Sequence, residues 1–76
     1  MKDRWSVYTY NEESGRAQKQ GAYRLLRDAQ EEAVRCLEGA NAVAVYDRQK
    51  NQAKETYGCF PIKFLEAIWA EEQKEG

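Results

Sequence analysis

The sequence predicts one small α+β domain, an antiparallel sheet of three to four strands with two helices in the order β-(β)-α-β-β-α. Three observations predict it: an alternating run at residues 5–10, a helix signature at 28–38, and two strand-like runs within 42–58 joined by a polar bend. A chain of 76 residues can enclose only one small core, so residues 1–76 are expected to form a single domain.

The first strand is predicted from WSVYTY, residues 5–10, which alternates and is made of aromatic and β-branched types. Alternation puts Trp5 and Val7 on one face and Tyr8 and Tyr10 on the other. Residues 11–15 hold the Asn, Ser and Gly of a turn, and the polar RAQKQG at 16–21 predicts a short edge strand.

The first helix is predicted at 28–38, because Asp28 followed three residues later by Glu31 has the spacing of a capping box. Gly39 is expected to end it in a left-handed cap. The apolar stripe at helical spacing is Leu26, Ala29, Ala33, Cys36 and Leu37.

An antiparallel hairpin is predicted at 42–58: NAVAVYD as a central strand, RQKNQ as the bend with Asn51 in the left-handed conformation, and AKETYG as the return strand. Gly58 ends that strand, so Tyr-Gly-Cys-Phe-Pro is interpreted as a strand-to-helix corner, with Pro61 as the first helical residue. The apolar stripe of this second helix is Ile62, Phe64, Leu65, Ile68 and Trp69. The acidic tail at about 71–76 is expected to fray.

Composition argues against metal and cofactor chemistry. The chain has two cysteines and no histidine, so a zinc site would lack its usual ligands, and we expect no bound metal or cofactor. No apolar segment resembles a signal peptide or a membrane span, which predicts a soluble cytoplasmic protein with free thiols.

Catalysis is not expected either. The sequence contains no phosphate-binding loop, dinucleotide-binding glycine pattern or serine-hydrolase elbow. The commonest general base is absent, and Cys59 has no imidazole to activate it. Adjacent glutamates such as Glu31 and Glu32 point in different directions on a helix, so we predict that the chain is not an enzyme.

Candidate binding residues come from tyrosines and from a basic stretch. Tyr8, Tyr10 and Tyr46 fall on the face opposite Trp5 and Val7, and residues 16–27 carry four positive charges and no negative one. The candidate partner-binding residues are Tyr8, Tyr10, Tyr46, Arg16, Lys19, Arg24 and Arg27. Three partners could cover the tyrosine face: the C-terminal helix, another protein chain, or nucleic acid whose bases stack on the rings.

The pattern Asp-Ala-x-x-Glu-Ala, then Val-x-Val-Tyr-Asp and a polar hairpin, is similar to that of many small phage and mobile-element proteins. Tyr57, Gly58 and Pro61 match the Tyr-Gly-x-x-Pro ending of a bacterial family of short domains, whereas Cys59 and Phe60 depart from the polar residues expected between them. In size and build the chain resembles anti-CRISPR proteins. That resemblance carries over no functional residue. It implies a non-catalytic, often dimeric inhibitor that occupies the surface of a host effector complex.

We therefore expect a protein-binding module, with a host CRISPR effector complex as the candidate partner. The alternative is a small nucleic-acid-binding module that uses the tyrosine face and residues 16–27, but a net charge of −1 disfavours it. A two-fold homodimer is also expected, since a core this small would leave the tyrosines and Trp69 incompletely buried in one chain.

Overall fold

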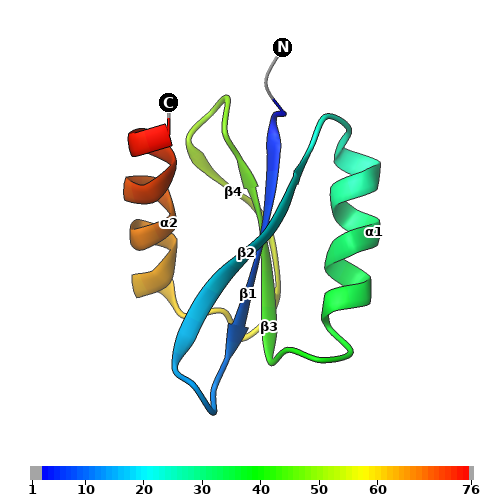
Figure 1. Cartoon of the computed structure of the whole chain (residues 1–76), viewed down its shortest axis with the longest axis vertical. Coiled ribbons are helices and arrows are strands. Elements are labelled where there is room, and N and C mark those ends of the chain that lie inside the picture. Colours follow the sequence, from blue (N-terminus) through cyan, green and yellow to red (C-terminus); the bar gives the residue numbers. More distant parts are fainter. Residues whose placement is uncertain (1–2, 76) are drawn as a thin grey trace.

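The computed structural model describes residues 3–75 and confirms the predicted α+β class and element order (Figure 1). The elements are β1 (Trp5–Asn11), β2 (Arg16–Tyr23), α1 (Leu26–Cys36), β3 (Ala42–Asp47), β4 (Gln52–Gly58) and α2 (Ile62–Glu75). The edge strand predicted at 16–21 is present and extends to eight residues.

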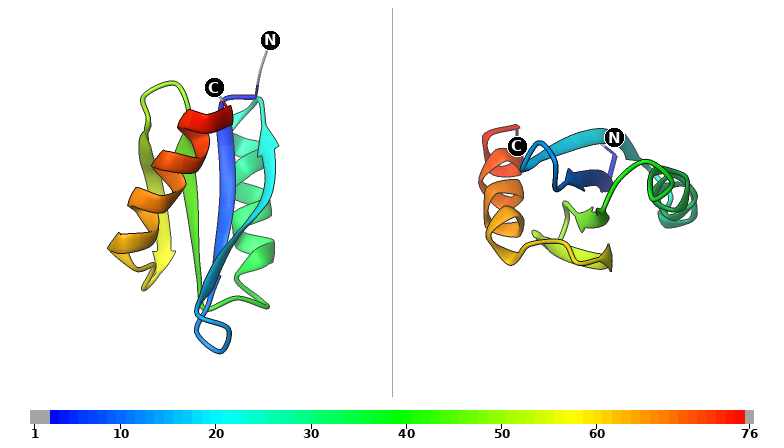
Figure 2. Two further views of the ribbon diagram at one scale, coloured as in Figure 1. Left: turned by 60° about the vertical axis from the view of Figure 1, so that its left-hand side comes forward. Right: turned by 90° about the horizontal axis from the view of Figure 1, so that it is seen from below.

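The four strands form one antiparallel sheet in the order β2-β1-β3-β4. The two helices cover opposite faces of this sheet, which gives three layers (Figures 1 and 2). Every residue of β3 is buried, as a central strand covered on both faces requires.

The predicted alternation of β1 decides which core each side chain enters. Trp5 and Val7 pack with the α1 side of the sheet, whereas Tyr8 and Tyr10 pack on the α2 side. The first core is built from Trp5, Val7, Ala29, Ala33, Val43 and Val45. The second is built from Tyr8, Ala42, Ala44, Tyr46, Phe60 and Ile68.

Each edge strand carries one irregularity in its pairing. Between Val7 and Tyr8 the register skips Gln20 of β2, and between Val45 and Tyr46 it skips Lys54 of β4. A bulge on an outer strand increases its local twist and interrupts the row of free backbone groups. Both edges of the sheet are therefore poor templates for pairing with another strand.

The limits of α1 differ from the prediction of 28–38. The helix begins at Leu26, its N-cap is Leu25 with no side-chain cap, and Asp28 lies within the first turn. The capping-box prediction is thus wrong, because the N-cap position belongs to Leu25 and not to Asp28. From within the first turn, the negative charge of Asp28 still stabilises the positive end of the helix dipole. Gly39 is not in the left-handed conformation either, since the helix closes through Leu37, whose N–H donates to the Ala33 carbonyl at 3.1 Å.

The hairpin at 42–58 is confirmed, and Asn51 adopts the left-handed conformation predicted for it, with φ of 57°. Asp47 organises this turn: its Oδ1 accepts hydrogen bonds from the backbone N–H groups of Gln49 and Lys50 at 2.9 and 3.2 Å. Arg4 donates to both carboxylate oxygens of Asp47 at 3.1 and 3.0 Å and stacks over Trp5. The turn is thereby fixed to the start of β1.

α2 runs from Ile62 to Glu75, so the predicted strand-to-helix corner is present, but Pro61 directly precedes the helix and is not its first residue. Fraying of the tail at 71–76 stays a prediction; in the structure residues 71–75 belong to α2, Glu72 is buried and Gln73 donates to Asn51 at 2.8 Å, while Gly76 lies outside the described residues. The predicted apolar stripe holds at Ile68 but not at Trp69, which is 49% exposed. A rotation of about 100° per residue carries Trp69 away from the sheet. The side chain of Ile62 lies outside the described part.

Candidate functional site

The tyrosine face of the sheet is covered by the C-terminal helix α2, which was one of the three possibilities that the sequence allowed. Tyr8 and Tyr46 are 5% and 1% exposed, and a partner cannot contact them while α2 is in place. Tyr10 is half-buried, with its ring centroid 5.2 Å from that of Phe64 and 6.2 Å from that of Phe60. Two of the three candidate tyrosines therefore lie inside the protein.

The four candidate basic residues do not form one patch. Arg16 begins β2 and Lys19 follows on the same strand, whereas Arg24 comes after its other end and Arg27 lies in α1. Arg16, Arg24 and Arg27 are exposed, but Lys19 forms an ion pair with Glu72, its Nζ lying 3.4 Å from Oε1. The structure thus joins Lys19 with Tyr8 and leaves Arg24 and Arg27 apart from them.

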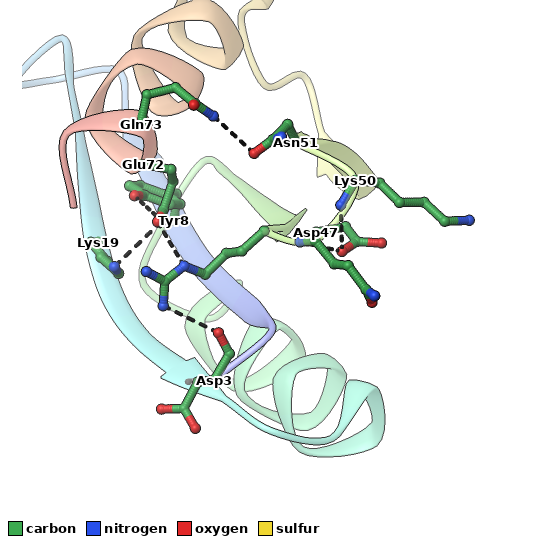
Figure 3. Close-up of polar contacts among 10 residues, drawn as sticks. Asp3, Tyr8, Lys19, Asp47, Lys50, Asn51, Glu72 and Gln73 are labelled. Atoms are coloured by element: carbon green, nitrogen blue, oxygen red, sulfur yellow. Dashed lines mark hydrogen bonds and ion pairs between the residues drawn. The ribbon is translucent and has the colours of Figure 1, made fainter. Parts of the chain in front are cut away.

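Glu72 is the centre of a polar cluster beneath α2, shown in Figure 3. The Tyr8 hydroxyl donates to Glu72 Oε1 at 2.7 Å, and Arg48 Nε lies 2.9 Å from Oε2. The side chain of Glu72 is only 2% exposed. The cluster therefore joins β1, β2 and the β3–β4 turn to the last turns of α2.

The Glu72 carboxylate is kept ionised by these neighbours. Burial alone raises the pKa of Glu72, but the hydroxyls of Tyr8 and Ser6 and the charges of Lys19 and Arg48 lower it below the ordinary value. Burial raises the pKa of Tyr46, and the negative charge of Glu72 adds to this effect. Glu72 thus supplies a fixed negative charge inside the second core.

The sequence did not indicate Glu72 or Arg48 as site residues. One signal was available: Glu72 follows Ile68 by four residues, which places it on the buried face of α2. A glutamate on that face predicts a buried partner. Its partners could not be found in this way, because Tyr8 is 64 residues away along the chain.

A groove lies beside this cluster, between β2 and α2. It has a volume of about 420 Å³, and its apolar lining comes from Tyr8, Ala17, Phe64, Ala67 and Ile68. Arg16, Lys19 and Glu71 also line it. Three of the candidate residues, Tyr8, Arg16 and Lys19, therefore line one groove, in which Tyr8 itself is only 5% exposed.

Of the two cysteines, Cys36 has the character of a structural thiol. Burial raises the pKa of Cys36, and its contact with the Glu32 carboxylate, Sγ to Oε2 at 3.5 Å, raises it further. Cys59 is exposed, and neither thiol is in a disulfide. Within residues 3–75, no three metal-ligating side chains are grouped so as to hold an ion, and no helix is long and apolar enough to cross a membrane.

Self-association stays a prediction, and Trp69 is now the residue that motivates it. We expect light scattering at micromolar concentration to give the mass of a dimer, because an exposed tryptophan on a helix favours burial against a second copy, most simply in a two-fold arrangement. Trp69→Lys should then give a monomer, whereas Val34→Lys, at an exposed position of α1, should leave the dimer intact. The mass of a single chain for the unaltered protein would contradict the prediction.

No family model, curated protein or solved structure matches this chain, so its function has to be argued from its own residues.

Proposed function

We propose that this chain is a non-catalytic protein-binding module that inhibits its target by occupying the target's surface. The observation that carries the proposal is the groove between β2 and α2, which is lined by apolar side chains together with Arg16, Lys19 and Glu71. Protein interfaces likewise combine apolar residues with charged and polar ones. The resemblance of build described above makes a host CRISPR effector complex the candidate target.

The arrangement of the aromatic rings favours protein over nucleic acid as the partner. Stacking of bases needs exposed rings, but Tyr8 and Tyr46 are enclosed beneath α2. Of the basic residues, Lys19 is already paired with a carboxylate, and the exposed Arg16 lies at the opposite end of β2 from Arg24. The candidate basic residues therefore do not form one continuous row along β2.

Capture from a bacterial lysate that contains CRISPR effector complexes tests the proposal. We expect the tagged protein to retain an effector subunit in the presence of nuclease. Ala67→Arg should abolish this capture, since Ala67 is exposed and lines the groove. Ala70→Arg is the matched control, because Ala70 is also exposed on α2 but does not line the groove.

Two results would contradict the proposal. One is capture that is equally strong in Ala67→Arg and Ala70→Arg, since the groove would then have no role. The other is recovery of nucleic acid alone, lost on nuclease treatment and falling steeply with added salt as phosphate contacts release counterions. That second result would establish the nucleic-acid-binding alternative.

A further inference from the structure

The polar cluster beneath α2 has the composition of an anion-binding site. The sheet and its β3–β4 turn supply two cations, Lys19 and Arg48, together with the hydroxyl of Tyr8. All of them converge on one carboxylate, and that carboxylate comes from α2. Hydrogen bonds and ion pairs to a buried carboxylate are the strong, charge-assisted kind.

The sheet carries further hydroxyl groups on this side that could donate hydrogen bonds to a carboxylate. Ser6 and Tyr46 are cross-strand neighbours on β1 and β3, and they are 0% and 1% exposed. Their hydroxyl oxygens have no hydrogen-bond partner among the described residues. Ser6 lies on the same face of β1 as Tyr8, two residues away, and Tyr46 lies directly across from Ser6. Two further buried hydroxyls thus lie on the α2 side of the sheet, the side from which Glu72 enters.

α2 itself is held to the sheet by few buried groups. Among its described side chains only Ile68 and Glu72 are buried, while Phe64 and Leu65 are half-buried and the others are exposed. A helix with so little buried surface is drawn from the less stable parts of a fold. The ion pairs of Glu72 are therefore a large share of what keeps α2 over the tyrosine face.

We propose that Ser6, Tyr8, Lys19, Tyr46 and Arg48 form a carboxylate-binding site on the sheet, that Glu72 fills this site from within the chain, and that an acidic side chain of a protein partner can take its place. The two cations and the surplus of hydroxyl donors give the site its preference for an oxyanion. Displacement of Glu72 would release the last turns of α2 from the sheet, next to the groove that the partner occupies. The last step, exchange with a partner, rests on the proposed protein-binding function, whereas the carboxylate site itself does not.

Rescue of Glu72→Ala by acetate tests the site in the full chain. Truncation to alanine removes the built-in ligand and leaves room for a small carboxylate. We expect sodium acetate to restore at least half of the loss in Tm, in a saturable manner, relative to sodium chloride at the same ionic strength. If Glu72→Ala is unfolded in chloride, folding induced by acetate is the same positive result.

Three variants serve as controls for the rescue. Glu72→Gln fills the site with its own amide, so acetate should not raise its Tm beyond the effect of chloride. Glu71→Ala alters an exposed neighbour on the same helix and should show no acetate effect. The double variant Glu72→Ala/Arg48→Gln lacks one cation and should lose the rescue. Equal Tm values in acetate and chloride for Glu72→Ala would overturn the carboxylate site.

A second measurement tests the exchange with a partner. If a partner carboxylate competes with Glu72, removing the charge of the competitor by Glu72→Gln should strengthen capture of the partner by about threefold or more. Capture that is unchanged or weakened in Glu72→Gln would overturn the exchange. A complete absence of capture in every variant would instead count against the proposed function, and acetate rescue would still decide whether the site exists.

Discussion

Gly58→Ala is expected to destabilise the protein by about 3 kcal/mol, because an L residue in the left-handed region costs 1–2 kcal/mol and overpacking adds a similar amount. Gly58 has a φ of +74°, and a Cβ placed on it would lie 2.6 Å from the carbonyl oxygen of Asn41. That oxygen cannot move away easily, since the backbone N–H of Asn41 donates to the Tyr10 carbonyl at 3.0 Å. The corner at the end of β4 thus requires glycine.

Gly15→Ala is the matched control. Gly15 also has a positive φ, of 68°, but a Cβ there would meet no atom within 4 Å. It should therefore lose about 1 kcal/mol from backbone strain alone. Urea unfolding followed by circular dichroism measures both variants, with m-values compared to verify that the unfolded states are alike. Equal losses in the two variants would show that the approach of Asn41 to Gly58 has no energetic consequence.

A loss of about 3 kcal/mol is large for a domain of this size, whose total stability is expected to be roughly 4–11 kcal/mol. It also bears on Tyr-Gly-Cys-Phe-Pro, which the sequence suggests is a strand-to-helix corner. Gly58 turns the chain out of β4, and Phe60 then enters the second core beside Tyr10. The carbonyl of Pro61 accepts a hydrogen bond from the N–H of Phe64 at 3.1 Å, which opens the first turn of α2.

Much of the fold could be predicted because its signals are local. Alternation in residues 5–10 and 42–47 is a property of neighbouring residues, and it placed Tyr8 and Val7 on their correct faces. The start of α1 was missed because Asp28 and Glu31 have the spacing of a cap whether or not the helix begins there. The N-cap is Leu25 instead, and its carbonyl accepts a hydrogen bond from the N–H of Ala29 at 3.2 Å.

The candidate site could be predicted only in part, because its geometry depends on contacts between distant parts of the chain. A cluster of glutamates near the C-terminus is typical of a solvated tail, and only Ile68, four residues before Glu72, signals otherwise. The charge of Glu72 is tolerated in the core because Arg48 and Lys19 reach it from the turn and from β2. No local pattern shows that these two cations and this acid meet.

Glu72→Ala is expected to destabilise the protein by about 2 kcal/mol, less than the roughly 3–5 kcal/mol for removing one partner of a fully buried ion pair. The reason is that the side chains of Lys19 and Arg48 are 27% and 18% exposed, so both can turn toward water, whereas the buried Tyr8 hydroxyl loses its hydrogen bond to the Glu72 carboxylate. Glu71→Ala should change stability by no more than about 0.5 kcal/mol, as for other exposed sites. Urea unfolding at neutral pH measures both variants.

The pH dependence of this loss separates the charge of Glu72 from the packing of its methylene groups. Because the folded protein lowers the pKa of Glu72 from the ordinary value of 4.5, the charge stabilises the fold fully above that value and progressively less as pH falls through the folded-state pKa. Arg4 also lowers the pKa of Asp47, so the unaltered protein loses stability from both groups on acidification. The difference between the unaltered protein and Glu72→Ala isolates Glu72, and it should shrink in acid. A difference that stays constant from neutral pH down through this range would show that α2 is held by packing and not by the ion pairs.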